Sequence, residues 1–257
     1  MKHACLFLML LLGYVGAYAS PLIADGHSDY VIVVGADALA PEKTAAAELQ
    51  EYLKAMTGVT LPIAEEKESA SAAHRIVLGP GALFREAFPD FDLATLRFDG
   101  IFMKTVGDTL YLAGDRPRGT LYAVYTLLEE EWGCRWWTAA DAYIPQKSRI
   151  DLPVLNKVYT PKLRYREAFY RGAFDAAFAP RIKCNGHFAA IPPERGGHYS
   201  ILGWCHTAYQ LLPPDNYFAE HPDWYSEIDG KRENVSISPP GQGAPEEPER
   251  GNYVYQA

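Results

Sequence analysis

Apolar residues in the first part of the chain form short continuous runs that alternate with stretches of helical spacing. The runs at 30–34 and 75–79 are bounded by glycine and predict buried strands. Between them, 41–56 predicts a helix, with Pro41 suited to its first turn and Gly58 to its end. Five apolar positions of this helix share one face: Ala45, Leu49, Tyr52, Leu53 and Met56.

Three further strands extend this pattern. Residues 59–63 predict an edge strand, because Pro62 cannot donate a hydrogen bond to a central ladder. Residues 100–106 and 109–113 predict a hairpin across the two-residue turn Gly107-Asp108. A glycine at the first turn position suits a type II′ connection.

A second amphipathic helix follows the hairpin. Asp115 is expected to cap it, Pro117 to lie in its first turn and Gly133 to end it before an aromatic strand at 134–137. Its apolar face comprises Leu121, Val124, Tyr125, Leu128 and Trp132. The fold class predicted for 20–153 is therefore α/β, a mixed sheet with two helices over one face.

The next stretch changes in character. Residues 151–161 are punctuated by proline and predict a connector, so a second unit is expected over 162–237. It should contain a strand at 162–170, a helix at 173–183 and a short strand at 203–207. A helix start at 215–221 and a small hairpin, 224–228 with 231 onward, complete it. Residues 238–257 consist largely of proline, glycine and glutamate and are expected to be disordered.

Composition narrows the class of partner. The chain has 257 residues, 48% hydrophobic and 22% charged, which suits one large globular domain or two modest ones. Its formal net charge is −8 and no Lys/Arg cluster forms a basic stripe, which argues against nucleic acid as a partner. Most of its 17 Tyr, 11 Phe and 5 Trp must be core residues, and a minority can stack against sugar rings.

The first nineteen residues predict an export signal. Lys2 supplies the positive start, 6–15 the apolar run, and Ala17-Tyr18-Ala19 the cleavage site. The apolar run is shorter than the ~20 residues of a membrane span. We therefore expect a secreted or periplasmic protein with no stable membrane anchor after cleavage. The mature chain would keep three cysteines, as one disulfide with an odd thiol or as buried free thiols: Cys134, Cys184 and Cys205.

Three phrases of the first unit resemble a known arrangement. They lie at 45–58, 118–125 and 133–136. They look like the N-terminal domain of family 67 alpha-glucuronidases, which is similar to the domain that precedes the barrel of beta-hexosaminidases. The resemblance covers about 25–150.

Residues 162–233 resemble the opening of the barrel region in an uncharacterised bacterial family grouped with glycoside hydrolases. The phrases 217–218, 221–226 and 230–232 carry this likeness. Together the resemblances imply a carbohydrate-active protein with no cofactor and with its chemistry on a (β/α)8 barrel. A whole barrel needs about 250 residues, so this chain is expected to hold only about the first two βα units of an incomplete TIM-like barrel. The paired carboxylates of such hydrolases can then lie beyond its end, and the chain can be a fragment.

Candidate site residues follow the predicted barrel strands. Glu167 is the candidate catalytic carboxylate and Arg166 a candidate substrate-binding residue, because barrel sites lie at the carboxyl ends of strands. The alternative is an ion pair between Glu167 and a neighbouring arginine. A hydrolase also needs a second carboxylate ~5–9.5 Å away. Glu194 and Asp223 are only nominal partners, since nothing in the sequence places them nearby.

Three more residues are candidates for substrate binding: Asn185, His187 and His206. Each can equally be a core or surface residue. The histidines show neither HxH nor HExxH spacing, so no metal site is expected. Gly79-Pro80-Gly81 can be a phosphate loop or a plain turn, and it lacks the glycine pattern of the former. A group of tryptophans can form a sugar platform or pack in the core: Trp132, Trp136 and Trp137.

Two functions remain open. The first is an exported glycoside hydrolase-like protein, expected in truncated form here, that in its complete form acts on polysaccharide-derived glycosides by carboxylate acid/base catalysis. The second is a non-catalytic carbohydrate-binding or scaffold module.

Overall fold

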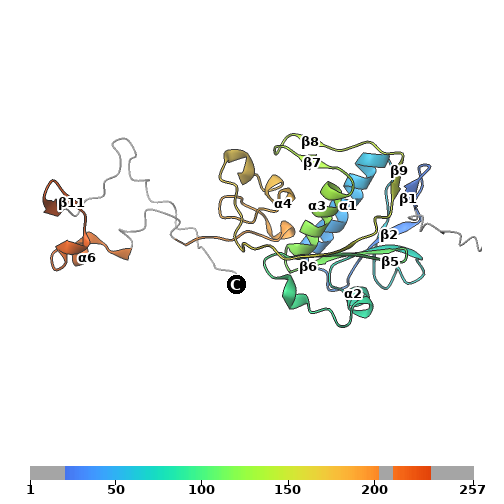
Figure 1. The fold of residues 1–257 in the computed structure, drawn as a ribbon, viewed down its shortest axis with the longest axis horizontal. Helices are drawn as coiled ribbons and strands as arrows, with labels where there is room; N and C mark the ends of the chain where they lie inside the picture. Colours follow the sequence, from blue (N-terminus) through green and yellow to red (C-terminus); the bar gives the residue numbers. More distant parts are fainter. Residues whose placement is uncertain (1–20, 203–210, 233–257) are drawn as a thin grey trace, which may run out of the picture.

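A six-stranded mixed sheet organises the first part of the molecule in the computed structural model, which describes residues 21–202 and 211–232 (Figure 1). The strand order is β10-β5-β6-β4-β2-β3, and β5 runs antiparallel to both of its neighbours while β3, β2, β4 and β6 are parallel. The strands are β2 (Tyr30–Val34), β3 (Ile63–Glu65), β4 (His74–Leu78), β5 (Ile101–Val106), β6 (Thr109–Gly114) and β10 (Asn156–Tyr159). The predicted mixed sheet is confirmed. The edge strand also exists, although it begins at Ile63 rather than at Val59.

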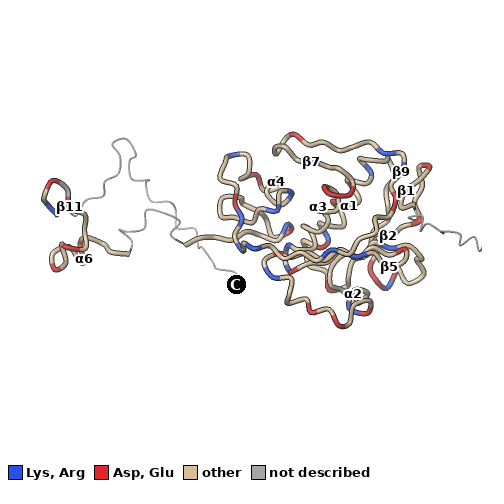
Figure 2. Tube along the Cα trace, viewed as in Figure 1, with Lys and Arg blue, Asp and Glu red and all other residues tan. Residues whose placement is uncertain are grey.

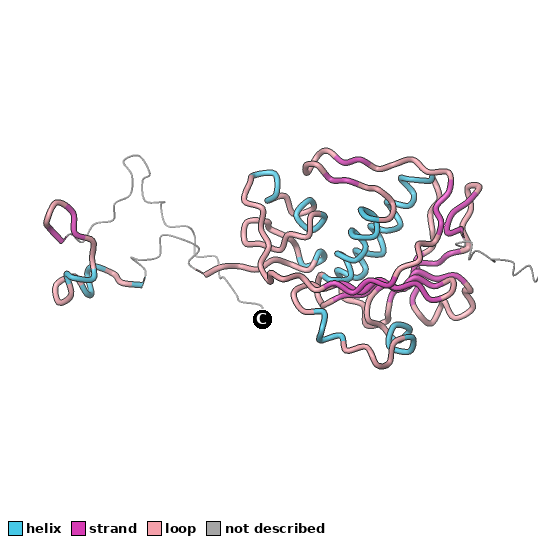
Figure 3. Tube along the Cα trace, viewed as in Figure 1, coloured by secondary structure: helices cyan, strands magenta, loops and turns pink. Residues whose placement is uncertain are grey.

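Two long helices cover one face of this sheet, as the sequence predicts. They are α1 (Ala40–Thr57) and α3 (Gly119–Glu130), and Figure 3 shows both on the same side of the strands. Alternate strand residues such as Ile32, Ile76 and Leu112 point toward them, because successive side chains leave a strand on opposite faces. The predicted apolar faces of both helices are buried in this core.

The opposite face is covered as well, by the short helix α2 (Ala82–Ala87) and the 3₁₀ helix η1 (Leu93–Leu96). Phe102 and Tyr111 point to this side and need apolar cover. An aromatic cluster supplies it: Phe84, Phe88 and Phe91. The prediction of helices on one face therefore holds only for the two long helices.

The aromatic strand predicted at 134–137 lies outside the main sheet. Only β7 (Arg135–Trp136) is extended, and it pairs with β8 (Ala142–Tyr143) above the two long helices (Figure 1). The physical reason is that the indole of Trp136 is anchored among those helices. Its Nε1 donates to the Tyr52 hydroxyl at 2.6 Å, and its ring meets that of Tyr125 edge to face. The core interpretation is confirmed for Trp132 and Trp136, whereas Trp137 is exposed.

The last strand of the main sheet comes instead from the predicted connector. Within 151–161 the chain forms β10, which pairs along the outer edge of β5. Just before it, β9 (Arg149–Asp151) pairs with β1 (Pro21–Ala24) in a separate two-stranded sheet. The connector is therefore part of the folded structure.

The start of α3 also differs from the prediction. Arg118 occupies the N-cap position and Pro117 precedes the helix. The carboxylate of Asp115 accepts a hydrogen bond from the Asp99 backbone N–H at 3.1 Å, so it does not cap α3. Burial raises the pKa of this carboxyl.

The segment that follows Pro161 has little regular structure. The strand predicted at 162–170 is absent, because the backbone N–H and C=O of Arg166 bond to Asn185 instead of to a strand ladder. The helix predicted at 173–183 is reduced to η2 (Arg171–Phe174) and α4 (Phe178–Arg181). A further 3₁₀ helix, η3 (Pro193–Arg195), packs on α1. Residues 21–202 and 211–232 do not form the predicted start of a barrel.

Residues 211–232 contain α6 (Pro214–Tyr217), the 3₁₀ helix η4 (Pro222–Trp224) and a small hairpin. The hairpin pairs β11 (Glu227–Ile228) with β12 (Lys231–Arg232), which confirms that prediction. The predicted export signal, the strand at 203–207 and the tail at 238–257 lie outside the described residues. Within the described ranges, no helix is both long and apolar enough to cross a membrane.

Two cysteines lie in the described part of the chain, Cys134 and Cys184, and both are buried free thiols. Burial raises the pKa of Cys134 to about 11 and also raises that of Cys184. Since the thiolate is the reactive form, we expect both to resist iodoacetamide in the folded chain at pH 8 and to react after unfolding in urea. Mass spectrometry of the labelled peptides measures this.

The raised pKa of Cys134 also has a consequence for stability. The folded state favours the protonated thiol, so this contribution is complete below pH 9 and is lost as the pH rises toward 11. Rapid reaction of Cys134 with iodoacetamide in the native chain at pH 8 would contradict the expectation that burial protects this thiol.

Candidate functional site

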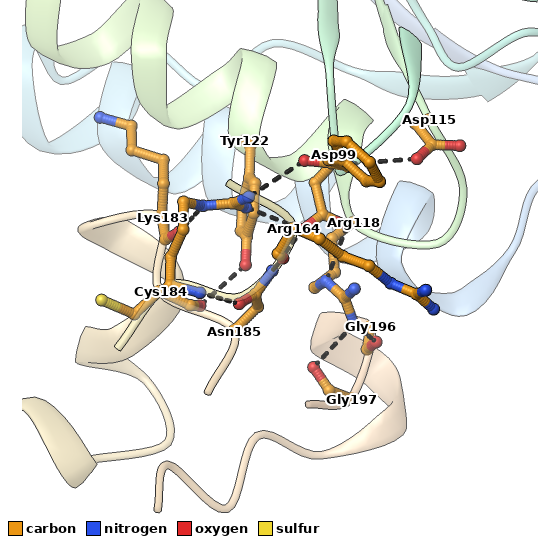
Figure 4. A network of polar contacts seen from close by, with 12 residues as sticks. Asp99, Asp115, Arg118, Tyr122, Arg164, Lys183, Cys184, Asn185, Gly196 and Gly197 are labelled. Atoms are coloured by element: carbon orange, nitrogen blue, oxygen red, sulfur yellow. Dashed lines mark hydrogen bonds and ion pairs between the residues drawn. The ribbon is translucent and has the colours of Figure 1, made fainter. Parts of the chain in front are cut away.

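One buried carboxylate joins the main sheet to the segment after Pro161. Asp99 precedes β5 in the left-handed backbone region, with φ 62°, and only 2% of the residue is exposed. Its Oδ1 accepts from Arg118 Nε at 2.9 Å. Its Oδ2 accepts from Arg166 Nη2 at 2.7 Å and from Asn185 Nδ2 at 2.8 Å (Figure 4). Three donors from distant parts of the sequence therefore converge on one side chain.

Both arginines of this network continue into backbone contacts. Arg118 Nη1 donates to the carbonyls of Gly196 and Gly197 at 2.9 and 3.2 Å. Arg166 donates from Nε to the Lys183 carbonyl at 2.9 Å, and from Nη1 to the carbonyls of Phe98 and Leu163. These hydrogen bonds hold the segment that follows Pro161 in place against the main sheet.

Asn185 is fully buried and uses both ends of its amide. Its Oδ1 accepts from the Arg166 backbone N–H at 2.8 Å, and its Nδ2 also donates to the Arg164 carbonyl. Next to it, the Tyr122 hydroxyl donates to the Cys184 carbonyl at 2.8 Å. The structure thus brings Arg166 and Asn185 together, as members of the contact that joins the two segments.

Glu167 lies in a second, half-buried cluster. Its Oε2 accepts from the Tyr165 hydroxyl, and its Oε1 accepts from the Phe188 backbone N–H at 2.7 Å. Burial and the hydrogen bond to Glu167 raise the pKa of Tyr165 to about 12, so the phenol is a donor at neutral pH. The alternative of an ion pair with a neighbouring arginine is not what holds Glu167, because Arg166 pairs with Asp99 and the Arg164 guanidinium lies over the ring of Tyr199.

His187 belongs to the same cluster. Its backbone N–H donates to the Tyr165 hydroxyl at 3.1 Å, and its Nδ1 accepts from the Ile201 N–H at 3.1 Å. Its ring meets Phe188 edge to face, and Phe188 in turn packs against two further rings, those of Phe169 and Phe174. Glu167 and His187 are therefore brought together, beside an aromatic group.

The other candidates lie elsewhere. Glu194 is on η3, where its carbonyl accepts from Thr44 of α1, and Asp223 is in η4. His206 lies outside the described residues. Across 21–202 and 211–232, no group of three or more His, Cys, Asp or Glu side chains could hold a metal ion.

The space beside the turn Gly79-Pro80-Gly81 is filled by the side chain of Glu42. The carboxylate of Glu42 accepts from the Leu39 backbone N–H at 2.9 Å and from Arg116 Nε at 2.8 Å. A Cβ on Gly79 would lie 3.0 Å from Glu42 Cδ, so this side chain fills the space beside the turn. The interpretation as a plain turn is favoured over a phosphate loop.

A cavity of about 300 Å³ opens beside the Asp99 network. It is lined by α3, by the ends of β5 and β10 and by the segment that follows Pro161. The polar lining includes Glu130, Lys157 and Lys183, and the ring of Tyr159 also borders it. Sequence reasoning missed this cavity and the role of Asp99. The one available signal was Arg118, which belongs to the phrase 118–125.

Comparisons with known proteins follow the same division of the chain. Residues 26–127 match the family described as the glycosyl hydrolase family 67 N-terminus, and 136–242 match DUF4838, a domain of unknown function. Both resemblances seen in the sequence are thereby confirmed. The probable alpha-glucuronidase A of Aspergillus terreus is 26% identical over an alignment of 114 residues, and the match covers 42% of this chain and 14% of that protein.

Two solved structures are similar at 15% identity. A family GH115 4-O-methyl-alpha-glucuronidase with specificity for decorated arabinogalactans has a TM-score of 0.42, over 57% of this chain and 19% of that one. A GH138 enzyme targeting pectin rhamnogalacturonan II has a TM-score of 0.30, over 39% and 13% respectively. The chain thus spans less than a fifth of the length of each of these three proteins.

Proposed function

We propose that this chain, which carries a glycosyl hydrolase family 67 N-terminal domain followed by a DUF4838 domain, works as a carbohydrate-active protein in which the first domain braces the second. The observation that carries the proposal is the Asp99 network. Asp99 and Arg118 lie in the first matched region, and Arg166 and Asn185 lie in the second. The relation to glycoside hydrolases supports carbohydrate as the ligand.

Glu167 is the proposed catalytic carboxylate. Two donors of different kinds hold it, a phenol and a backbone N–H, so its orientation is defined. Orientation of this kind is what acid/base catalysis requires of a carboxylate. In this proposal residues 1–19 direct the protein to the periplasm or the exterior.

One observation favours the second candidate function, a non-catalytic carbohydrate-binding or scaffold module. Arg166 and Asn185 direct their hydrogen bonds toward Asp99 and the protein backbone. Two of the residues that would contact substrate are thus engaged in joining the domains.

Hydrolysis of 4-nitrophenyl glycosides by the full chain separates the two functions. With Glu167→Gln we expect turnover to fall by about 10²–10⁴-fold, because the carboxylate can no longer exchange a proton. With Tyr165→Phe we expect a smaller loss, in kcat rather than in KM, since that hydroxyl only orients Glu167.

Glu194→Gln is the matched control, because Glu194 is an exposed carboxyl in the same segment. Turnover that is unchanged in Glu167→Gln removes this residue from the site. Glycan binding by the full chain without turnover supports the scaffold function.

A further inference from the structure

We propose that the cavity beside the Asp99 network binds one neutral sugar residue, at a site separate from Glu167. The inference rests on the proposed carbohydrate function but not on catalysis by Glu167. The volume of about 300 Å³ lies at the lower end of ligand cavities, and residues of both matched regions line it.

The charges around this cavity favour a neutral ligand. In the part of the chain that the structure describes, each charged side chain of the lining has a partner of opposite sign: Lys157 with Glu130, Lys183 with Glu129, and Arg166 with Asp99. Figure 2 shows Lys and Arg positions interspersed with Asp and Glu positions along the described part of the chain, rather than gathered in one region of a single sign. An anionic ligand would have to enter beside Glu130 and Asp99, and a cation beside the lysines and Arg166.

The lysine–carboxylate pairs of the lining can also form hydrogen bonds with the hydroxyl groups of a ligand. A lysine ammonium has three donors and a carboxylate about four acceptor positions, and the contact within a pair uses only one of each. The side chains of Lys157 and Glu130 are 35% and 48% exposed, so their remaining capacity faces solvent. Because a sugar hydroxyl both donates and accepts, neighbouring hydroxyls can bond to both members of such a pair.

The apolar part of the lining suits the C–H face of a sugar ring. It consists of Ile101, Tyr122, Tyr159 and Pro161. Tyr159 lies two residues from Lys157 on β10, so both project from the same side of the strand and both line the cavity. Tyr159 is still 52% exposed, and a ligand in the cavity would cover part of its ring.

Saturation-transfer NMR with the full chain tests the proposal, with methyl β-D-xylopyranoside and methyl α-D-glucopyranoside as neutral probes and D-glucuronate as the anionic one. We expect a neutral glycoside to bind and glucuronate to bind at least about tenfold more weakly. Tyr159→Ala should weaken neutral binding by about three- to tenfold, because the aromatic contact is lost. Tyr159→Phe should retain it.

Val158→Ala is the matched control, since Val158 is an exposed neighbour on the same edge strand that does not line the cavity. If Tyr159→Ala fails to fold by circular dichroism, Lys157→Met provides the same readout from the polar side. Binding that is equal in Val158→Ala and in the cavity variants overturns the proposal, as does preference for glucuronate or the absence of binding by both neutral probes. Binding lost only in Glu167→Gln would overturn this site while leaving the proposed function in place.

Discussion

Replacing Asp99 by asparagine should lower the free energy of unfolding by about 3–5 kcal/mol, the usual cost of removing one partner from a buried ion pair. The side chains of Arg118 and Arg166 are only 6% and 18% exposed, so both guanidinium groups would lose their counter-charge in a site with little water. Asparagine tolerates the left-handed backbone of this position and has the same shape. The substitution therefore keeps the shape of the side chain, removes its charge and turns one of its two acceptor atoms into an NH2 donor that faces other donors.

Urea unfolding followed by tryptophan fluorescence measures this loss. Asp151→Asn is the control, because the pair of Asp151 with Arg149 is about half exposed and solvent screening leaves it little effect on stability. Hydrogen exchange should show residues 162–202 losing protection before α1 does, since Asp99 holds that segment. Equal urea midpoints for the two variants would refute the assigned role.

Gly119→Ala should destabilise the chain by about 3 kcal/mol, although alanine is the better helix former by about 1 kcal/mol. The first turn of α3 lies directly against the ends of two strands. A Cβ on Gly119 would be 2.5 Å from the Gly100 carbonyl oxygen and 2.7 Å from Gly114 C, and backbone atoms cannot move aside as a flexible side chain can. Both Gly114 and Gly119 are thus required by this close packing of backbone against backbone.

The thermal midpoint of Gly119→Ala, compared with that of Gly107→Asn, measures this effect. Gly107 is in the hairpin turn with φ 56°, and nothing lies within 4 Å of its added Cβ. Asparagine is accepted at such a backbone angle, so this control should stay within about 0.5 kcal/mol of the original. A Gly119→Ala chain as stable as the control would mean that α3 does not approach the strands this closely.

The elements that were predictable are those whose evidence is local. Strands β2 and β4 and helices α1 and α3 bury continuous or periodic apolar positions, and the sequence displays those directly. In contrast, β10 is an edge strand that buries little, so Asn156–Tyr159 has no apolar signature. The strand predicted at 162–170 fails for a related reason, since Asn185 supplies the bonds that a neighbouring strand would have made.

The candidate site was predictable only in part. Glu167, His187, Arg166 and Asn185 do lie near residues of chemical interest, but in two clusters rather than one. No local sequence pattern marks Asp99 as a site residue, because its hydrogen-bond partners are 19, 67 and 86 positions away in the chain. A lone aspartate acquires its role only from folding.

The position of β10 governs how this protein can be divided. A fragment cut at residue 127, where the first family match ends, or at 153 would strip the outer flank of β5 of its hydrogen-bonded neighbour. The uncovered row of backbone N–H and C=O groups would then recruit strands from other molecules, and the fragment would precipitate. A fragment of the first domain that is to fold alone must therefore extend past Tyr159, into residues that match the DUF4838 family.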